Sequence, residues 1–154
     1  MINTMIGAIG AALRSEFGDL CQIHSEGAGE GRVGPCFFIQ VLESGLGLAQ
    51  GGGCARINQF LIRYFPESEM EPNRECHETA ERMFSCLEWI TWEGGRQQRG
   101  TRMRYSMEEG RLNFFVNYDC ILSRKKQEMP MEELISQMEI KGGSLPGQQK
   151  DKAT

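Results

Sequence analysis

The order of sequence patterns predicts an α+β domain with a mainly antiparallel sheet of about five strands, flanked by two helices. Apolar residues recur at three- and four-residue steps in two segments, as in helices, and they alternate or run continuously in the segments between, as in strands. The expected order is helix, three strands, helix, two strands. A length of 154 residues suits one domain, which we place at 1–123, followed by a short helical extension at 124–141 and a flexible tail at 142–154.

The first helix is marked by apolar residues that share one face: Ile2, Ile6, Ile9, Leu13 and Phe17. Gly18 follows as a plausible C-terminal stop.

Three strands and two glycine-rich loops are expected next. A short strand at 20–25 leads into the loop EGAGEGRVGP at 26–35. The segment 36–42 is apolar on both faces, which is typical of a central strand covered on both sides. A second glycine-rich loop at 45–53 precedes a long strand at 55–65.

The second helix follows an acidic connector and is marked by a further apolar stripe: Cys76, Ala80, Met83, Leu87 and Ile90. Asn73 is the expected N-cap, and Glu78 is expected to pair with Arg82 on the outside.

A hairpin completes the domain. Alternating apolar residues predict cross-strand pairs of Met107 with Leu112, Tyr105 with Phe114, and Met103 with Val116, joined by a two-residue turn at Glu109 and Gly110. A slip of one residue would mix the two faces, so the pattern favours this register.

Beyond Ser123 the composition changes. A basic stretch is followed by a short helix expected to start at Pro130, and 142–154 has almost no core-forming residues.

Composition and motifs exclude several function classes. Lys and Arg total 17 and Asp and Glu 21, a formal charge of −4 that argues against a general nucleic-acid binder. No apolar stretch is long enough for a membrane span, and no positive segment precedes the N-terminal apolar run, so cytoplasmic synthesis without export is expected. The six cysteines are expected to be reduced and mostly buried. No nucleotide loop, metal-ligand spacing or catalytic constellation is found, so no catalytic residue, metal or cofactor is predicted.

Candidate interface residues come from the arginine concentration and the glycine-rich loops. The simpler interpretation of the arginines is an edge strand kept soluble by outward charges. The alternative is a face that meets an acidic partner subunit or passing DNA. The candidates are Arg32, Gly47, Gly52, Arg96, Arg99, Arg102 and Arg104.

Several segments in this order resemble a known family. They are the N-terminal helix, GPCFFI at 34–39, IRYFP at 62–66 with the acidic connector before Asn73, the helix through Ala80, and GRLNFFVNY at 110–118. Over roughly 1–123 the chain resembles the tail terminator proteins of phages and prophages of Gram-positive bacteria.

The resemblance implies a structural protein that forms a ring, usually of six subunits, on the head-proximal end of a tail tube. Such a ring stops tube growth and offers a docking surface to the head connector or head-completion protein. In a contractile tail it would also touch the last sheath ring, and a headless tail-like bacteriocin would use the same cap. DNA would meet it only by passing through the lumen, and the expected location is the virion tail, assembled in the bacterial host cytoplasm.

Two alternatives remain open at this point. One is another ring component of the head–tail connection, such as a head-completion protein or the tube subunit. The other is a small enzyme or host-modifying factor encoded beside phage genes, which a pocket with perturbed titratable groups would favour.

Overall fold

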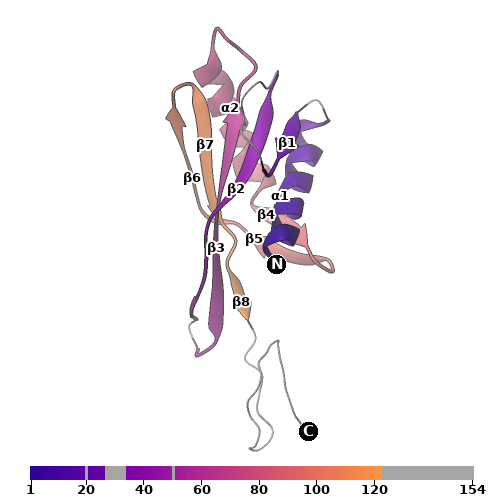
Figure 1. Ribbon diagram of the computed structural model, residues 1–154, viewed down its shortest axis with the longest axis vertical. Coiled ribbons are helices and arrows are strands. Elements are labelled where there is room, and N and C mark those ends of the chain that lie inside the picture. The colour runs from indigo at the N-terminus through magenta and orange to yellow at the C-terminus, as the bar shows by residue number, and fades with distance from the viewer. Residues whose placement is uncertain (20, 27–33, 50, 123–154) are drawn as a thin grey trace, which may run out of the picture. The chain divides into compact units, whose positions relative to one another are not determined.

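A computed structural model describes residues 1–19, 21–26, 34–49 and 51–122 (Figure 1). The chain divides into a main compact unit, Met1–Ala49 with Ala55–Ile121, and a second unit, Gln50–Cys54 with Leu122–Thr154, of which 51–54 and 122 are described. The predicted helix at Pro130, the predicted tail and Arg32 lie outside the described residues. No helix in the described ranges is long and apolar enough to cross a membrane.

The elements follow the predicted α+β class. The helices are α1 (Ile2–Phe17) and α2 (Pro72–Cys86). The strands are β1 (Gln22–His24), β2 (Cys36–Leu48), β3 (Cys54–Phe65), β4 (Trp89–Trp92), β5 (Arg96–Arg99), β6 (Thr101–Glu108), β7 (Arg111–Asn117) and β8 (Cys120–Leu122).

The main sheet is mixed but mostly antiparallel, which confirms the predicted class. Its strand order is β1-β2-β3-β7-β6, and β8 also pairs with β3, so it has six strands rather than five. The parallel pair is β1 with β2, with Gln22 opposite Cys36, whereas β7 runs antiparallel to both β3 and β6.

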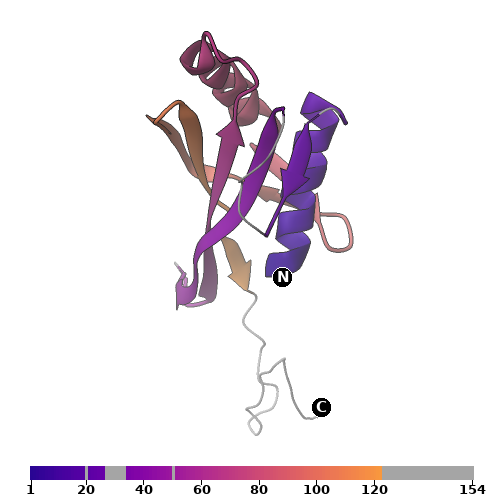
Figure 2. The ribbon, with the colours of Figure 1, turned by 45° about the horizontal axis from the view of Figure 1, so that its top comes forward.

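Both helices pack on one face of this sheet (Figures 1 and 2). They bury Met5, Ile9 and Leu13 from α1 and Cys76, Ala80 and Met83 from α2. The opposing sheet residues alternate along their strands and share the same core: Phe60, Ile62 and Tyr64 of β3, and Leu112, Phe114 and Val116 of β7. The residues between them point to the other face, which no helix covers within the described part of the chain.

Strand β2 is longer than predicted. The segment 36–42 was expected to be covered on both faces, but burial is high only at its start, at Cys36, Phe37 and Ile39. The strand then continues to Leu48, so the first part of the predicted loop at 45–53 is wrong. Its glycines lie beside β3, where a Cβ on Gly47 would come within 3.2 Å of Ile57 Cδ1. The ladder with β3 therefore overrides the low strand propensity of glycine.

Helix α2 differs from its prediction at both ends. It starts at Pro72, directly after Glu71, so Asn73 is not the N-cap, and proline occupies a first-turn position where its missing N–H costs nothing. It ends at Cys86, and Ile90 belongs to β4 although its spacing continued the helical stripe. Leu87 and Ile90 are both buried in the same core, and this shared burial explains why the stripe ran on past the helix.

The β4–β5 hairpin is absent from the sequence prediction. It forms a separate two-stranded sheet with Trp89 opposite Arg99 and Trp92 opposite Arg96. Its turn holds Glu93 and two glycines at positive φ, and β4 packs beside α1.

The β6–β7 hairpin confirms two of its three predicted pairs, Met107 with Leu112 and Tyr105 with Phe114. Glu109 and Gly110 have φ of 51° and 74°, as the predicted two-residue turn requires. The third pair, Met103 with Val116, falls where a bulge shifts the register between Thr101 and Arg104.

Candidate functional site

The titratable side chains offer little chemistry. All six cysteines are free, and Cys21, Cys36, Cys76 and Cys120 are buried, as expected. Burial raises the pKa of the Cys21 and Cys76 thiols to about 11 and that of Cys86 to about 12. These thiols are therefore protonated at neutral pH and are poor nucleophiles. Within the described ranges, no group of three His, Cys, Asp or Glu side chains is arranged to hold a metal ion.

A tight polar network ties the acidic connector to α2. Tyr64 Oη donates a hydrogen bond of 2.6 Å to the Glu75 carboxylate, and the backbone N–H groups of Glu67 and Ser68 donate two more at 2.8 Å. Burial acts to raise the pKa of Glu75, but these three hydrogen bonds outweigh it and lower the pKa below its usual value. Burial and the bond to Glu75 raise the pKa of Tyr64. The network fixes a loop and leaves no free base.

The two helices are joined by an ion pair other than the predicted one. Arg82 Nε lies 2.9 Å from the Glu16 carboxylate of α1, whereas Glu78 lies 3.6 Å from Arg74. The predicted pair of Glu78 with Arg82 is therefore wrong, because Arg82 reaches across to α1.

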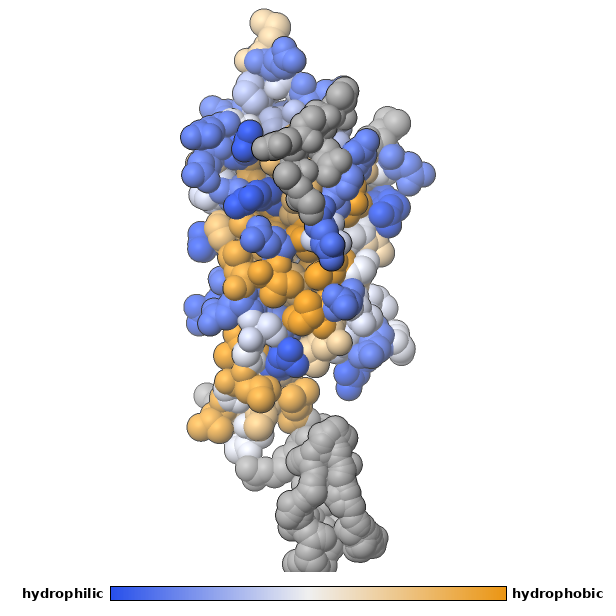
Figure 3. Space-filling model, viewed as in Figure 1, coloured by the Kyte–Doolittle hydropathy of each residue, from blue (hydrophilic) through white to orange (hydrophobic). Residues whose placement is uncertain are grey.

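The β2–β3 hairpin extends past the N-terminal end of α1 and carries exposed leucines (Figure 1). Leu46 is 70% exposed and Leu48 93%, and Ile57 of β3 adds a further exposed apolar side chain. Figure 3 shows apolar side chains gathered over this part of the hairpin. We call Leu46, Leu48 and Ile57 the apolar arm. An apolar group on a projecting hairpin indicates an interaction site.

The alternation of β2 shifts by one residue where the arm begins. Phe37 and Val41 pack on the core, yet Ser44, three residues on, donates a 2.9 Å hydrogen bond to Asn58 Oδ1. Asn58 is fully buried, and its Nδ2 lies 3.7 Å from Met5 Sδ of α1. Ser44 therefore faces the helix side, as Phe37 does, although the two positions are seven apart and regular alternation would place them on opposite faces. A change of phase of this kind is typical of a β-bulge.

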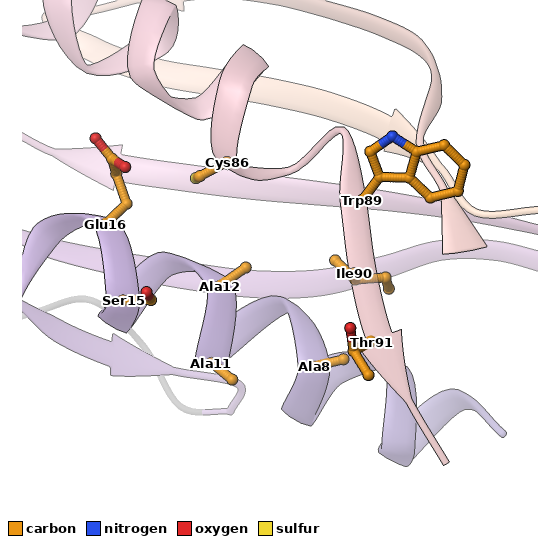
Figure 4. Close-up of a pocket in the computed structure, with 9 residues that line it drawn as sticks. All are labelled: Ala8, Ala11, Ala12, Ser15, Glu16, Cys86, Trp89, Ile90 and Thr91. Atoms are coloured by element: carbon orange, nitrogen blue, oxygen red, sulfur yellow. The ribbon is translucent and has the colours of Figure 1, made fainter. Parts of the chain in front are cut away.

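A shallow groove of about 380 Å³ lies between α1 and the segment that leads from α2 into β4 (Figure 4). Its α1 wall consists mostly of small side chains, and Trp89, 53% exposed, stands at its rim. The lining residues are Ala8, Ala11, Ala12, Ser15, Glu16, Cys86, Trp89, Ile90 and Thr91. Glu16, the carboxylate in this lining, is paired with Arg82.

The four predicted interface arginines do not share one strand. Arg96 and Arg99 lie on β5, with their guanidinium groups over the rings of Trp92 and Trp89 at 5.3 and 5.9 Å. Arg99 is also 3.3 Å from Glu88. Arg102 and Arg104 lie on β6, an edge strand of the main sheet, as the simpler interpretation expected.

The helix-free face of the main sheet carries a second set of arginines. Arg104 lies 3.9 Å above the ring of Phe115, and Arg111 lies 4.8 Å above that of Phe65. Arg63 is exposed on β3 between buried neighbours, opposite Asn113 of β7. We call Arg63, Arg104 and Arg111 the basic face. The sequence analysis missed Arg63 and Arg111, although their alternation with core residues of the same strands marks their direction.

The candidate glycines have different positions. Gly47 is a strand residue of β2, whereas Gly52, in the second unit, has φ of 90° in the left-handed region that favours glycine.

The comparison with family models decides the family. The model described as "Phage tail terminator protein" matches residues 4–130, which is most of the chain. The chain belongs to the phage tail terminator family. As a terminator it is a structural component of a phage-like tail particle, as the resemblance implied.

Solved structures of low identity accompany this match. A chain of the native gene transfer agent virion is 10% identical over 78% of the terminator and 95% of that chain, with a TM-score of 0.49. The sheath/tube terminator of an extracellular contractile injection system, PVC, is 14% identical over 91% of the terminator, with a TM-score of 0.46. The anti-feeding prophage cap is 13% identical over 90%, with a TM-score of 0.47.

The terminator spans 64% and 61% of the length of the last two chains. The comparison with curated proteins gave no match. The family membership therefore rests on the family model alone.

Proposed function

We propose that the terminator assembles into a ring of six copies on the head-proximal end of a tail tube, where it ends tube polymerisation and provides the docking surface for the head connector. The family match supports this proposal, because it covers nearly all of the described fold. The particle is a phage or prophage virion or a headless tail-like bacteriocin. Its other partners are the tube protein, a head-completion protein and, in a contractile particle, the sheath, and DNA meets it only in the lumen.

The apolar arm is the observation that supports a tube contact most directly. Leu46 and Leu48 expose most of their side chains, and burying one such side chain gains about 1.5–3 kcal/mol. A single copy obtains this free energy only when a partner covers the apolar arm. Repetition of the contact around a ring multiplies the gain and makes a weak contact per subunit sufficient.

The proposed activity requires no bond to be made or broken, so we also propose that the terminator is not an enzyme. To end a polymer, a protein needs one face that makes the contacts of a tube subunit and another face that does not bind a further tube subunit. The raised pKa values of Cys21, Cys76 and Cys86 are consistent with a structural part, because these thiols stay protonated. No metal or cofactor is proposed.

Electron microscopy of tails from a strain that lacks the protein tests the proposal. Overgrown or headless tails are expected, with normal length restored by the wild-type chain. The double change Leu46→Ser and Leu48→Ser should fail to restore length. Ile121→Ser is the matched control, because Ile121 is 70% exposed, as Leu46 is, but lies on β8 outside the apolar arm. Normal tails and normal infectivity without the protein would refute the proposal.

A further inference from the structure

The terminator separates its charges into two blocks. From Pro66 to Glu81 the chain has six glutamates and one arginine, a net −5 with His77 neutral. From Gly94 to Met107 it has four arginines and no acidic residue, and one of these, Arg104, belongs to the basic face together with Arg63 of β3 and Arg111 of β7. Because the whole chain carries only −4, each block is a local feature rather than a consequence of composition.

The acidic block is presented to solvent along the connector and the outer side of α2. Its exposed carboxylates are those of Glu67, Glu69, Glu71, Glu78 and Glu81. Arg74, the single arginine of the block, lies 3.7 Å from Glu71 and 3.6 Å from Glu78, and the side chains of these pairs are 65–73% exposed. Such exposed pairs contribute little, so the block keeps its negative potential.

The basic face is likewise presented to solvent, since Arg63, Arg104 and Arg111 are all exposed. Glu108 is the cross-strand partner of Arg111, and its carboxylate accepts a 3.1 Å hydrogen bond from Asn113 Nδ2. The guanidinium groups of Arg104 and Arg111 rest on aromatic rings, which hold them in place and leave their N–H donors available.

The two surfaces lie on opposite sides of the sheet. Tyr105 of β6 faces α2, since its Oη lies 2.8 Å from His77 Nδ1 and its ring packs on Phe84. The preceding residue, Arg104, points the other way, over Phe115. The part of the acidic block on α2 therefore lies on the helix side of the sheet, whereas the basic face of the same copy lies on the helix-free side.

We propose that the acidic block of one copy docks on the basic face of the next copy, so that the two surfaces form the subunit interface of the ring. Different patches of identical chains then meet, which is the kind of contact that closes into a ring when the rotation allows it. This inference rests on the proposed ring and adds the surfaces that build it. The charge pairs set the register of the contact, and removing one partner of a pair that the contact buries weakens the association.

DNA is the other polyanion that a basic face could contact. Three arginines per copy on a chain of net −4 are few for a DNA surface. The chain itself supplies a complementary block of net −5, and its concentration in a growing ring is high, so a second copy is the occupant that the charges favour.

Charge reversal tests the interface. Arg63→Glu with Arg104→Glu should abolish ring formation, as measured by light scattering and electron microscopy, and Glu69→Arg with Glu71→Arg should do the same. Mixing the two variants should restore assembly in a ring in which they alternate. At one interface the two unchanged surfaces meet, and at the next the two reversed surfaces meet, so opposite charges face each other at both. The matched control is Arg14→Glu with Glu43→Arg, since both residues are exposed and lie outside the two blocks. The control should assemble like the wild type.

Each outcome distinguishes the interface from the function. If both reversed variants form wild-type rings and still restore tail length, the interface is refuted and the capping function stands. If the arginine variant forms rings but loses salt-dependent retention of DNA, the basic face binds DNA and the interface is again refuted. If wild-type chains neither form rings nor shorten tails, the proposed function itself fails.

A variant that unfolds would resemble one that fails to assemble, so each is first checked by thermal melting. Arg63→Gln with Arg104→Gln provides a milder second variant. The protein concentration needed for half of the chains to assemble should rise at least tenfold. Mixing with the Glu69→Arg, Glu71→Arg variant should not restore assembly. Wild-type assembly of the glutamine variant would refute the interface.

Discussion

Among the glycines that the structure describes, Gly100, between β5 and β6, has the closest neighbours to an added methyl group. Gly100 is buried, and its N–H donates a 2.7 Å hydrogen bond to the Glu88 carbonyl. A Cβ there would lie 2.8 Å from the Leu87 carbonyl oxygen, 2.9 Å from Val116 Cγ2 and 3.2 Å from Tyr118 Cε1. The Leu87 carbonyl cannot withdraw freely, because it also accepts a 2.6 Å hydrogen bond from Tyr118 Oη.

The expected cost of Gly100→Ala follows from these contacts. Overpacking a core costs about 1–3 kcal/mol, and weakening the hydrogen bond of the Gly100 N–H adds about 1 kcal/mol. The free energy of unfolding should therefore fall by about 2–4 kcal/mol. With an unfolding entropy of about 0.25 kcal/mol per kelvin for a domain of about 120 residues, the melting temperature should fall by about 8–16 °C.

Thermal melting at one fixed protein concentration measures the effect, because ring assembly would make melting depend on concentration. Gly7→Ala is the matched control: it adds the same methyl group inside α1, where a Cβ meets nothing within 4 Å. Alanine there should stabilise by about 0.5–1 kcal/mol through helix propensity. If Gly100→Ala melts within about 2 °C of the wild type, the close approach at Gly100 is not a packing constraint and the reasoning fails.

Two further predictions concern the hairpin and the acidic connector. Tyr105→Ala removes a half-buried aromatic side chain that faces α2, and it should lower the free energy of unfolding by about 3 kcal/mol, measured with denaturant. Arg104→Ala, on the opposite face, should lower it by less than about 1 kcal/mol. Equal, small effects of the two changes would mean that the assignment of the two faces is reversed. Glu75→Gln should cost about 1.5–3 kcal/mol at pH 7. Because the pKa of Glu75 is lowered on folding, its carboxylate stabilises the fold above the usual carboxyl pKa of about 4.3 and loses this effect as the pH falls through the lowered value. A difference between wild type and Glu75→Gln that does not change with pH would contradict this.

The sequence by itself determined the elements whose pattern is local. The α1 stripe, the β6–β7 turn at Glu109 and Gly110, and the pairing of Tyr105 with Phe114 were all predicted, and all were found. Each follows from residues a few positions apart, so short-range periodicity and turn geometry are enough to specify it.

Tertiary structure decided the features that depend on distant partners. Ile90 continues the spacing of α2 but lies in β4. Its side chain is buried in the core that α2 also contacts, and such burial is equally favourable in a helix and in a strand, so the spacing alone does not decide between them. Gly45 and Gly47 read as a loop but form strand, because β3 supplies the ladder. The basic face unites Arg63, Arg104 and Arg111 from three strands, and only sheet register brings them together. Sequence spacing orders residues along a chain, whereas a surface is made by strands that the chain brings side by side.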